Sequence, residues 1–276
     1  MILQSFRGRA RSVWESLVQP VQVTVSPARR DRDGFWIHRV RSPYQTGSTQ
    51  IRVLLPEPAK SHEPYPVVYV LPVEARNGSE YGDGMREVQE HDLHNRHHAI
   101  FVAPTFSQPP WYADHPSNPV IRQETYLLNV VIPFVERTYP VIARREGRRL
   151  LGFSKSGWGA CTLLLRHPEV FDRAAPWDAP VMMEWPSQFD SAEIFATREN
   201  FERYHVQRLL REKCPALGSQ CRLWLAGYRT FRPHLQEMHA LLERLQIRHE
   251  YRDGPDRPHH WHSGWVSEAV AWLFGP

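Results

Sequence analysis

The residues that could carry out chemistry begin with a serine near the middle of the chain. Ser154 follows a short apolar run ending at Leu151 and precedes a stretch with a helical apolar face. A serine between a strand end and a helix start, with small residues two positions away on both sides, is the pattern of a nucleophile elbow. Those positions hold Gly152 and Ser156, so a serine replaces the second glycine of G-x-S-x-G. An ordinary helix N-cap is the competing interpretation.

Histidines that could activate this serine gather in the sequence PDRPHHWHSGW. A serine hydroxyl holds its proton at neutral pH, so it needs a base within hydrogen-bond reach and an acid that orients the base. His259, His260 and His262 all lie between the last predicted strand and the last predicted helix, so each is a candidate base. A metal site is the competing interpretation, but the cluster has no acidic or cysteine residue at ligand spacing. We therefore expect no metal and no cofactor.

The elements that must position these groups alternate along the chain. Apolar runs and alternating patterns predict strands at 35–40, 50–55, 67–71, 99–104, 148–151, 173–177, 222–226 and 249–251. Amphipathic patterns predict helices at 85–96, 121–139, 154–167, 233–245 and 264–274. The first two strands should form an antiparallel pair. Strands that then alternate with helices predict an α/β fold with a doubly wound, mostly parallel sheet and helices on both faces.

The length of 276 residues is compatible with one α/β domain. We expect an arginine-rich N-terminal arm at 1–20 and a single domain at 21–276. Residues 181–217 show no strand pattern and are expected to form a small helical cap insertion, with helices around Ser191 and at 201–210. Four large apolar residues in this segment look exposed and could line an acyl pocket or pack the cap on the core, namely Met182, Met183, Trp185 and Phe189.

The composition is that of a globular protein, with 41% hydrophobic and 23% charged residues. The formal net charge is only +4, and the basic residues are scattered among acidic ones rather than clustered. A nucleic-acid partner is therefore not expected.

The chain also lacks the sequence features of membrane and secreted proteins. No apolar run approaches the roughly 18 residues that a transmembrane helix needs. The N-terminal sequence MILQSFRGRARSVW has no apolar core of the signal-peptide kind. The three cysteines, Cys161, Cys214 and Cys221, have no C-x-x-C spacing, which argues against a disulfide framework. We expect a soluble, cytoplasmic protein with no membrane partner.

Five motifs, taken in order, resemble the esterase D / antigen 85 branch of the α/β-hydrolase superfamily. They are PVVYVLPVEA, AIFVAPTF with the WYAD loop, ETYLLNVVIPFVERTYP, GFSKSGWGA and the H-x-W near the end. The resemblance extends from about residue 51 to the end of the chain. It implies an α/β-hydrolase fold and a serine hydrolase that cleaves a small-molecule carboxylic ester through an acyl-enzyme on Ser154, without a cofactor.

The resemblance also implies how the oxyanion is bound. The backbone N–H of Lys155, the residue after the nucleophile, would point into the oxyanion site, helped by the positive end of the helix. The second donor would come from the loop after the first buried strand, at Val73 or Glu74. This loop lacks the His-Gly pair that is usual in the family.

The base and the acid are less sharply defined. His259 with Trp261 matches the H-x-W pattern of the family best, whereas His260 keeps the family spacing to Trp265. Most relatives place the acid just after the penultimate strand, following a glycine that is Gly227 here, but this chain continues with Tyr-Arg-Thr.

Asp178, at the end of the strand after the elbow helix, is the nearest substitute for that acid. The same aspartate could equally be a turn residue before Pro180.

Two other functions are compatible with these departures from the pattern. A degenerate hydrolase fold could serve as a binding module, since the acid, the second elbow glycine and the oxyanion loop all differ from the family. An acyltransferase could resolve the same acyl-enzyme with an alcohol or sugar instead of water. The sequence does not indicate the oligomeric state or the identity of the ester.

Overall fold

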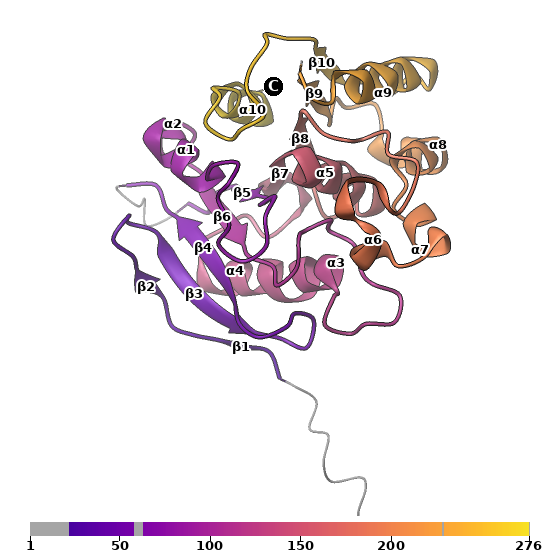
Figure 1. The fold of residues 1–276 in the computed structure, drawn as a ribbon. Coiled ribbons are helices and arrows are strands. Elements are labelled where there is room, and N and C mark those ends of the chain that lie inside the picture. Colours follow the sequence, from indigo (N-terminus) through magenta and orange to yellow (C-terminus); the bar gives the residue numbers. More distant parts are fainter. Residues whose placement is uncertain (1–21, 58–62, 228, 276) are drawn as a thin grey trace, which may run out of the picture.

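The computed structural model describes residues 22–57, 63–227 and 229–275 (Figure 1). The arm expected at 1–20 lies outside the described residues.

A ten-stranded sheet runs through the described part of the chain, in the order β1-β3-β4-β6-β5-β7-β8-β9-β10, with β2 paired to β3. The strands are β1 (Thr24–Val25), β2 (Arg29–Arg30), β3 (Trp36–Arg41), β4 (Thr49–Leu54), β5 (Val67–Val70), β6 (Ile100–Pro104), β7 (Arg148–Phe153), β8 (Arg173–Trp177), β9 (Trp224–Ala226) and β10 (Glu250–Arg252). The β3–β4 and β4–β6 pairs are antiparallel, and every pair from β6 to β10 is parallel. The predicted mixed, mostly parallel sheet is confirmed.

The helical elements connect these strands and cover the sheet. They are α1 (Gly84–Glu90), α2 (Leu93–Arg96), α3 (Gln123–Tyr126), η2 (Leu127–Val131), α4 (Ile132–Thr138), η3 (Arg145–Gly147), α5 (Ser154–Arg166), η4 (Gln188–Asp190), α6 (Ala192–Phe195), α7 (Arg198–Glu202), α8 (Val206–Leu217), α9 (Arg232–Arg244) and α10 (Val266–Leu273).

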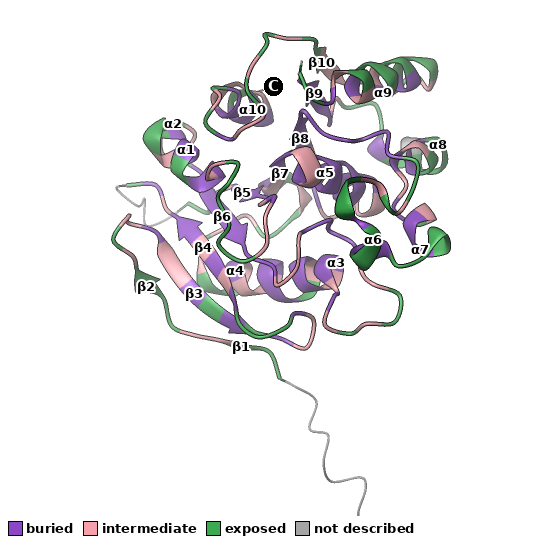
Figure 2. Cartoon of the chain, in the orientation of Figure 1, coloured by how far each residue is buried: buried purple, intermediate pink, exposed green. Residues whose placement is uncertain are grey.

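The sheet separates two hydrophobic clusters, as expected when strands are buried on both faces. In β5, Val67 and Tyr69 belong to the cluster beneath α3–α5, α8 and α9, whereas Val68 and Val70 belong to the cluster beneath α1 and α10. The central strands are buried throughout, and α9 exposes its outer side (Figure 2). This layering keeps the carboxyl ends of β5, β7 and β8 side by side at one edge.

Two predicted helices are interrupted. The segment expected as one helix at 121–139 is built from α3, the π-helical η2 and α4, with Pro133 at the start of α4. Proline has no N–H to donate, so the i→i−4 pattern is broken at its position. The helix expected at 85–96 breaks at Asp92, which adopts a left-handed conformation with φ of 55° between α1 and α2.

The segment 181–217 contains η4, α6, α7 and α8 and no strand. The expectation that its four large apolar residues are exposed is half right. Trp185 and Phe189 are exposed, but Met182 and Met183 are buried in the core between α9 and the sheet. The backbone explains the difference, because the Met182 N–H donates to His234 Nδ1 on α9 at 3.1 Å and so holds this part of the segment inward.

Within the described ranges, no helix combines the length and the apolar character that crossing a bilayer requires.

Candidate active site

Ser154 lies at a sharp turn between β7 and α5. Its φ is 52°, in the left-handed region that non-glycine residues enter only when the surrounding structure holds them there. The turn depends on Gly152, since a Cβ added there would lie 2.3 Å from the carbonyl oxygen of Ser156. Gly157 is equally confined, because its added Cβ would lie 2.7 Å from Cβ of Ala179. The strand–turn–helix geometry is that of a nucleophile elbow.

Ser156, which replaces the second glycine of the pattern, is fully buried and stabilises this turn. Its hydroxyl accepts a hydrogen bond from the Phe153 N–H at 3.0 Å and donates to the Phe153 carbonyl at 2.9 Å. A small side chain therefore fits where glycine is usual, and its polar atom is satisfied at the helix start.

Asp178 follows β8 directly, and its φ of 39° turns the chain away from the strand. The residue is fully buried. One carboxylate oxygen, Oδ2, accepts a hydrogen bond from His259 Nδ1 at 2.6 Å. The other, Oδ1, accepts a hydrogen bond from the Phe231 N–H at 2.8 Å. A buried carboxylate with both oxygens hydrogen-bonded is held in one orientation.

The end of β9, where most relatives would continue toward the acid, packs tightly on Asp178. The Asp178 N–H donates to the Ala226 carbonyl at 2.8 Å. Gly227 has a φ of 153°, and a Cβ added there would lie 2.8 Å from Cα of Asp178. The loop after Gly227 thus contributes the backbone N–H of Phe231 to the carboxylate instead of contributing the carboxylate itself.

His259 is the histidine that the structure brings to Asp178. Its ring lies among three aromatic side chains, with centroid distances of 4.8 Å to Phe153, 5.6 Å to Phe231 and 5.8 Å to Tyr81. Phe153 directly precedes Ser154, so the imidazole lies beside the elbow. Among the described residues, His259 Nε2 has no hydrogen-bond partner, whereas Nδ1 donates to Asp178. An imidazole with Nδ1 protonated and Nε2 free can accept a proton.

His260 and His262 point elsewhere. His260 Nδ1 accepts a hydrogen bond from the His262 N–H at 3.1 Å, and its ring lies against Gly82. Burial, and then the neighbouring His262, lower the pKa of His260. His262 Nδ1 donates to Glu87 at 2.7 Å, and its Nε2 accepts a hydrogen bond from the Asp83 N–H at 3.1 Å. Both nitrogens of His262 are therefore engaged away from the elbow.

Two backbone N–H groups lie at the same edge of the sheet as Ser154. Lys155 is in the first turn of α5, where an N–H has no partner within the helix. Val73 follows β5, which pairs in parallel with β7. Among the described residues, no protein group accepts a hydrogen bond from either N–H. Free donors converging on one edge, at the positive end of a helix, can stabilise a developing oxyanion.

The loop that carries His259 is anchored by stacked tryptophans. Trp177, next to Asp178, stacks on Trp265 with a centroid distance of 5.0 Å and an interplanar angle of 4°. Trp265 in turn stacks on Trp261 at 5.2 Å, and its Nε1–H donates to the His260 carbonyl at 3.2 Å. The two tryptophans of the sequence pattern thus fix the histidine loop against the strand that ends in Asp178.

A pocket of about 1200 Å³ opens beside this edge of the sheet. Its lining includes Val73 and Glu74 of the loop after β5, together with His260. The Glu74 carboxylate accepts a hydrogen bond from the Tyr81 N–H at 3.2 Å, and burial raises its pKa. The loop expected to supply the second oxyanion donor therefore forms one wall of a space that can hold a small organic ligand.

The fold and this arrangement of serine, histidine and aspartate define an α/β-hydrolase. The model of the family described as "Putative esterase" matches residues 42–225 of the chain. The chain belongs to this family and is a carboxylic ester hydrolase.

Solved structures of esterases share the fold. A ferulic acid esterase superposes with a TM-score of 0.67 at 18% identity, over 92% of this chain and 96% of that one. An S-formylglutathione hydrolase from Staphylococcus aureus gives 0.69 at 18% identity, over 88% and 99%. A fluorophosphonate-binding serine hydrolase from the same organism gives 0.68 at 18% identity, over 91% and 100%. A comparison with curated proteins finds no match.

Sequence reasoning missed two features of the site. One is the Phe231 N–H that holds Asp178, since a backbone donor leaves no mark in the sequence. The other is the contact of His262 with Glu87, on α1, with Glu90 nearby. The histidine cluster does have acidic neighbours, but they lie about 170 positions away and only the fold brings them together.

Proposed function

We propose that Ser154, His259 and Asp178 form the catalytic triad of this esterase, with the N–H groups of Lys155 and Val73 as the oxyanion hole. The observation that carries the proposal is the hydrogen bonding of the two ring nitrogens of His259. Its Nδ1 donates to a fully buried aspartate at 2.6 Å, and its Nε2 is free beside the residue that precedes Ser154. Of the three candidate histidines, His259 alone combines a carboxylate partner with a free second nitrogen among the described residues.

The reaction follows from these positions. His259 Nε2 takes the proton of the Ser154 hydroxyl as the oxygen attacks the ester carbonyl, and Asp178 stabilises the imidazolium that forms. The tetrahedral oxyanion accepts hydrogen bonds from the Lys155 and Val73 N–H groups. The imidazolium then gives its proton to the leaving alcohol, and an acyl group remains on Ser154. Water, deprotonated by the same imidazole, releases the acid and restores the serine.

The substrate is a small-molecule ester, and its binding region is proposed from two features. On one side, Val73 and Glu74 of the loop after β5 line a pocket of about 1200 Å³, whose lining does not include Ser154, His259 or Asp178. On the other side Phe189, from the segment 181–217, packs edge-on against Phe231 at 5.2 Å, and Phe231 packs against His259. These contacts support a cap role for that segment, since they connect it through one aromatic ring to the proposed base.

The degenerate binding module is the weaker alternative. It was motivated by the serine at position 156 and by the missing acid after Gly227. The hydroxyl of Ser156 is fully hydrogen-bonded within the elbow. In place of an acid after β9, Asp178 at the end of the neighbouring strand β8 accepts a hydrogen bond from His259. Membership of an esterase family also favours catalysis.

The test is hydrolysis of p-nitrophenyl acetate and butyrate together with labelling by a fluorophosphonate probe. We expect the unmodified chain to hydrolyse at least one ester and to be labelled on Ser154. Ser154→Ala should lose labelling and lower kcat by at least about 10³-fold, because the nucleophile is removed. Ser219→Ala, at an exposed serine outside the proposed cap segment, is the control and should keep both. Labelling that persists in Ser154→Ala would refute the assignment.

A further inference from the structure

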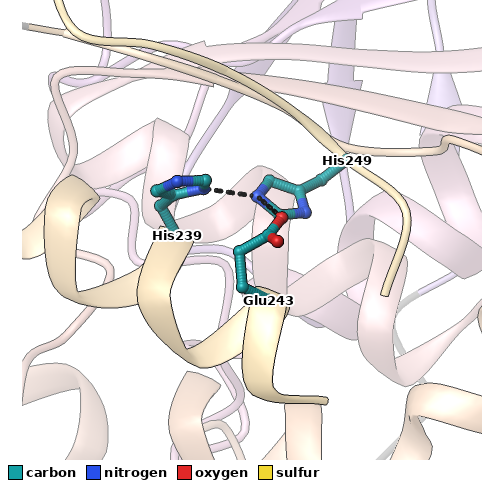
Figure 3. A group of neighbouring side chains, drawn as sticks. All are labelled: His239, Glu243 and His249. Carbon is teal, nitrogen blue, oxygen red and sulfur yellow. Dashed lines mark hydrogen bonds and ion pairs between the residues drawn. The ribbon is translucent and has the colours of Figure 1, made fainter. Parts of the chain in front are cut away.

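A second cluster of chemically capable side chains lies away from the proposed triad, between α9 and the approach to β10. His239 and Glu243 are four residues apart on α9, so they share one face of the helix. His249 lies immediately before β10. Figure 3 shows the three side chains pointing toward one another, with dashed lines joining His249 to His239 and to Glu243. The triad does not use any of them.

The distances between the polar atoms of these three side chains are close to the distances between ligands of one metal ion. His239 Nδ1 lies 2.8 Å from His249 Nε2, and His249 Nε2 lies 3.8 Å from a carboxylate oxygen of Glu243. The ligand atoms of all three lie within 4.8 Å of one another. Two ligands about 2.0–2.1 Å from a tetrahedral ion are about 3.3 Å apart. The two distances of 2.8 and 3.8 Å each differ from that value by roughly half an ångström, which side-chain rotation can supply.

The environment orients the two imidazoles so that one ring nitrogen of each faces the other. His249 Nδ1–H donates to the Ile247 carbonyl at 2.8 Å, so its Nε2 is the unprotonated nitrogen. The His249 side chain is only 2% exposed. The His239 ring stacks on Tyr251 with a centroid distance of 4.3 Å and an interplanar angle of 16°. A ligating histidine commonly donates its other N–H to a backbone carbonyl in this way, which orients the ring and raises its basicity.

We propose that His239, Glu243 and His249 bind one Zn²⁺ ion. The ion takes the place of the proton that His239 Nδ1 shares with His249 Nε2. Two imidazoles and one carboxylate suit Zn²⁺, whereas Mg²⁺ and Ca²⁺ prefer oxygen ligands. The exposed side of Glu243 leaves the remaining coordination position to water.

A metal at this site would join two elements that support the triad. Helix α9 starts next to Phe231, whose N–H holds Asp178, and β10 leads into the loop that carries His259. At the first turn of α9, Arg232 already forms two hydrogen bonds to Asp253, at 2.8 Å each. The metal would add a second connection two turns along the same helix. Its role is structural, because its three ligands do not contact the proposed catalytic residues.

The test is calorimetric titration of the full chain, without a histidine tag, with Zn²⁺ alone, followed by Co²⁺ spectroscopy. We expect a 1:1 site that raises Tm and gives the intense visible bands of four-coordinate Co²⁺. His239→Asn and Glu243→Gln should each weaken Zn²⁺ binding by at least about tenfold. Glu237→Gln, at an exposed position on the same helix, is the matched control and should bind as the unmodified chain does. The Tm of each variant in EDTA shows that it is folded.

A second group, Glu87, Glu90 and His262, could also attract a metal, so His262→Gln is titrated in parallel. We expect the 1:1 site to persist in that variant. The proposal is overturned if Zn²⁺ binds more weakly than about 100 μM, if the double variant His239→Asn/Glu243→Gln binds it unchanged, or if His262→Gln abolishes the site. Because the measurement is metal binding, its outcome is independent of esterase activity.

Discussion

The loop before α10 holds two histidine–carboxylate pairs of nearly equal length. His259 meets Asp178 at 2.6 Å, and His262 meets Glu87 at 2.7 Å. In both pairs Nδ1 donates to a buried carboxylate, with side-chain exposures of 0% for Asp178 and 4% for Glu87. A short contact between a histidine and a buried acid therefore does not by itself distinguish a catalytic pair from a structural one.

The difference lies in the second nitrogen and in what it faces. Nε2 of His262 accepts a hydrogen bond from the Asp83 N–H, at the start of α1, so this pair ties the histidine loop to a helix. Nε2 of His259 has no partner among the described residues, and its ring lies against Phe153, next to Ser154. A base must have a free lone pair to accept a proton, and among the described residues only the first pair has one.

The largest expected effect comes from replacing each candidate histidine with alanine. His259→Ala should lower kcat for p-nitrophenyl butyrate by about 10⁵-fold, because the proton of Ser154 then has no acceptor. His260→Ala and His262→Ala should change kcat by less than about threefold, although His262→Ala should lower the free energy of unfolding by about 1–3 kcal/mol, because Glu87 Oε2 and the Asp83 N–H each lose a hydrogen bond. A loss in His260→Ala as large as that in His259→Ala would transfer the role of base to His260.

Replacing the carboxylate of each pair with an amide should give a smaller difference in kcat in the same direction. Asp178→Asn keeps the shape of the acid but favours the wrong imidazole tautomer, and we expect kcat to fall by about 10⁴-fold. Glu87→Gln should leave kcat nearly unchanged and lower Tm. Steady-state kinetics and thermal unfolding of both variants measure the contrast. Equal losses of kcat would mean that the two pairs act as one unit.

A third histidine–carboxylate contact extends the comparison to stability. Glu124 of α3 is bonded by Arg166 at 2.6 and 2.9 Å and by His167 at 2.7 Å. Burial acts to raise its pKa, but the hydrogen bonds and charges of His167 and Arg166 outweigh it and lower the pKa from 4.5 to about 2.

Because the folded pKa of Glu124 is the lower one, this carboxylate stabilises the fold above pH 4.5, and the contribution is lost as the pH falls toward 2. The contribution amounts to about 3 kcal/mol. Urea unfolding at several pH values should show that Glu124→Gln is less stable than the unmodified chain at pH 6. The difference should shrink steadily below pH 4.5. A constant difference over that range would contradict the assigned shift.

Much of the fold could be predicted because hydrophobic pattern and strand burial agree. The fully buried strands β5 and β6 are continuous apolar runs, and β8 has the predicted bounds of Arg173–Trp177. The interruptions at Asp92 and before Pro133 were harder to predict. A left-handed residue and a π-helical turn preserve the amphipathic pattern on both sides, so the pattern alone reads as one helix.

The residue types of the candidate site could be predicted from the sequence, but the hydrogen bonds between them could be predicted less well. Ser154 could be found from its small neighbours, because the turn itself dictates them. The choice between His259 and His260 could not be made from the sequence, since adjacent residues in a loop differ only in where the backbone turns them. Asp178 could be proposed only as a substitute, because its burial and its bond to Phe231 depend on how the loop after β9 folds back.

The strand pairing of β7 with β8 sets Phe153 opposite Trp177, and the chain leaves each strand at the next residue. The proposed nucleophile and acid are thus neighbours by virtue of one register, and only the imidazole must be delivered from a distant part of the polypeptide. Because Asp178 is the proposed acid, no side chain between Gly227 and Phe231 has to supply a carboxylate. What this turn supplies to the proposed acid is the backbone N–H of Phe231, which donates to Asp178 Oδ1 at 2.8 Å.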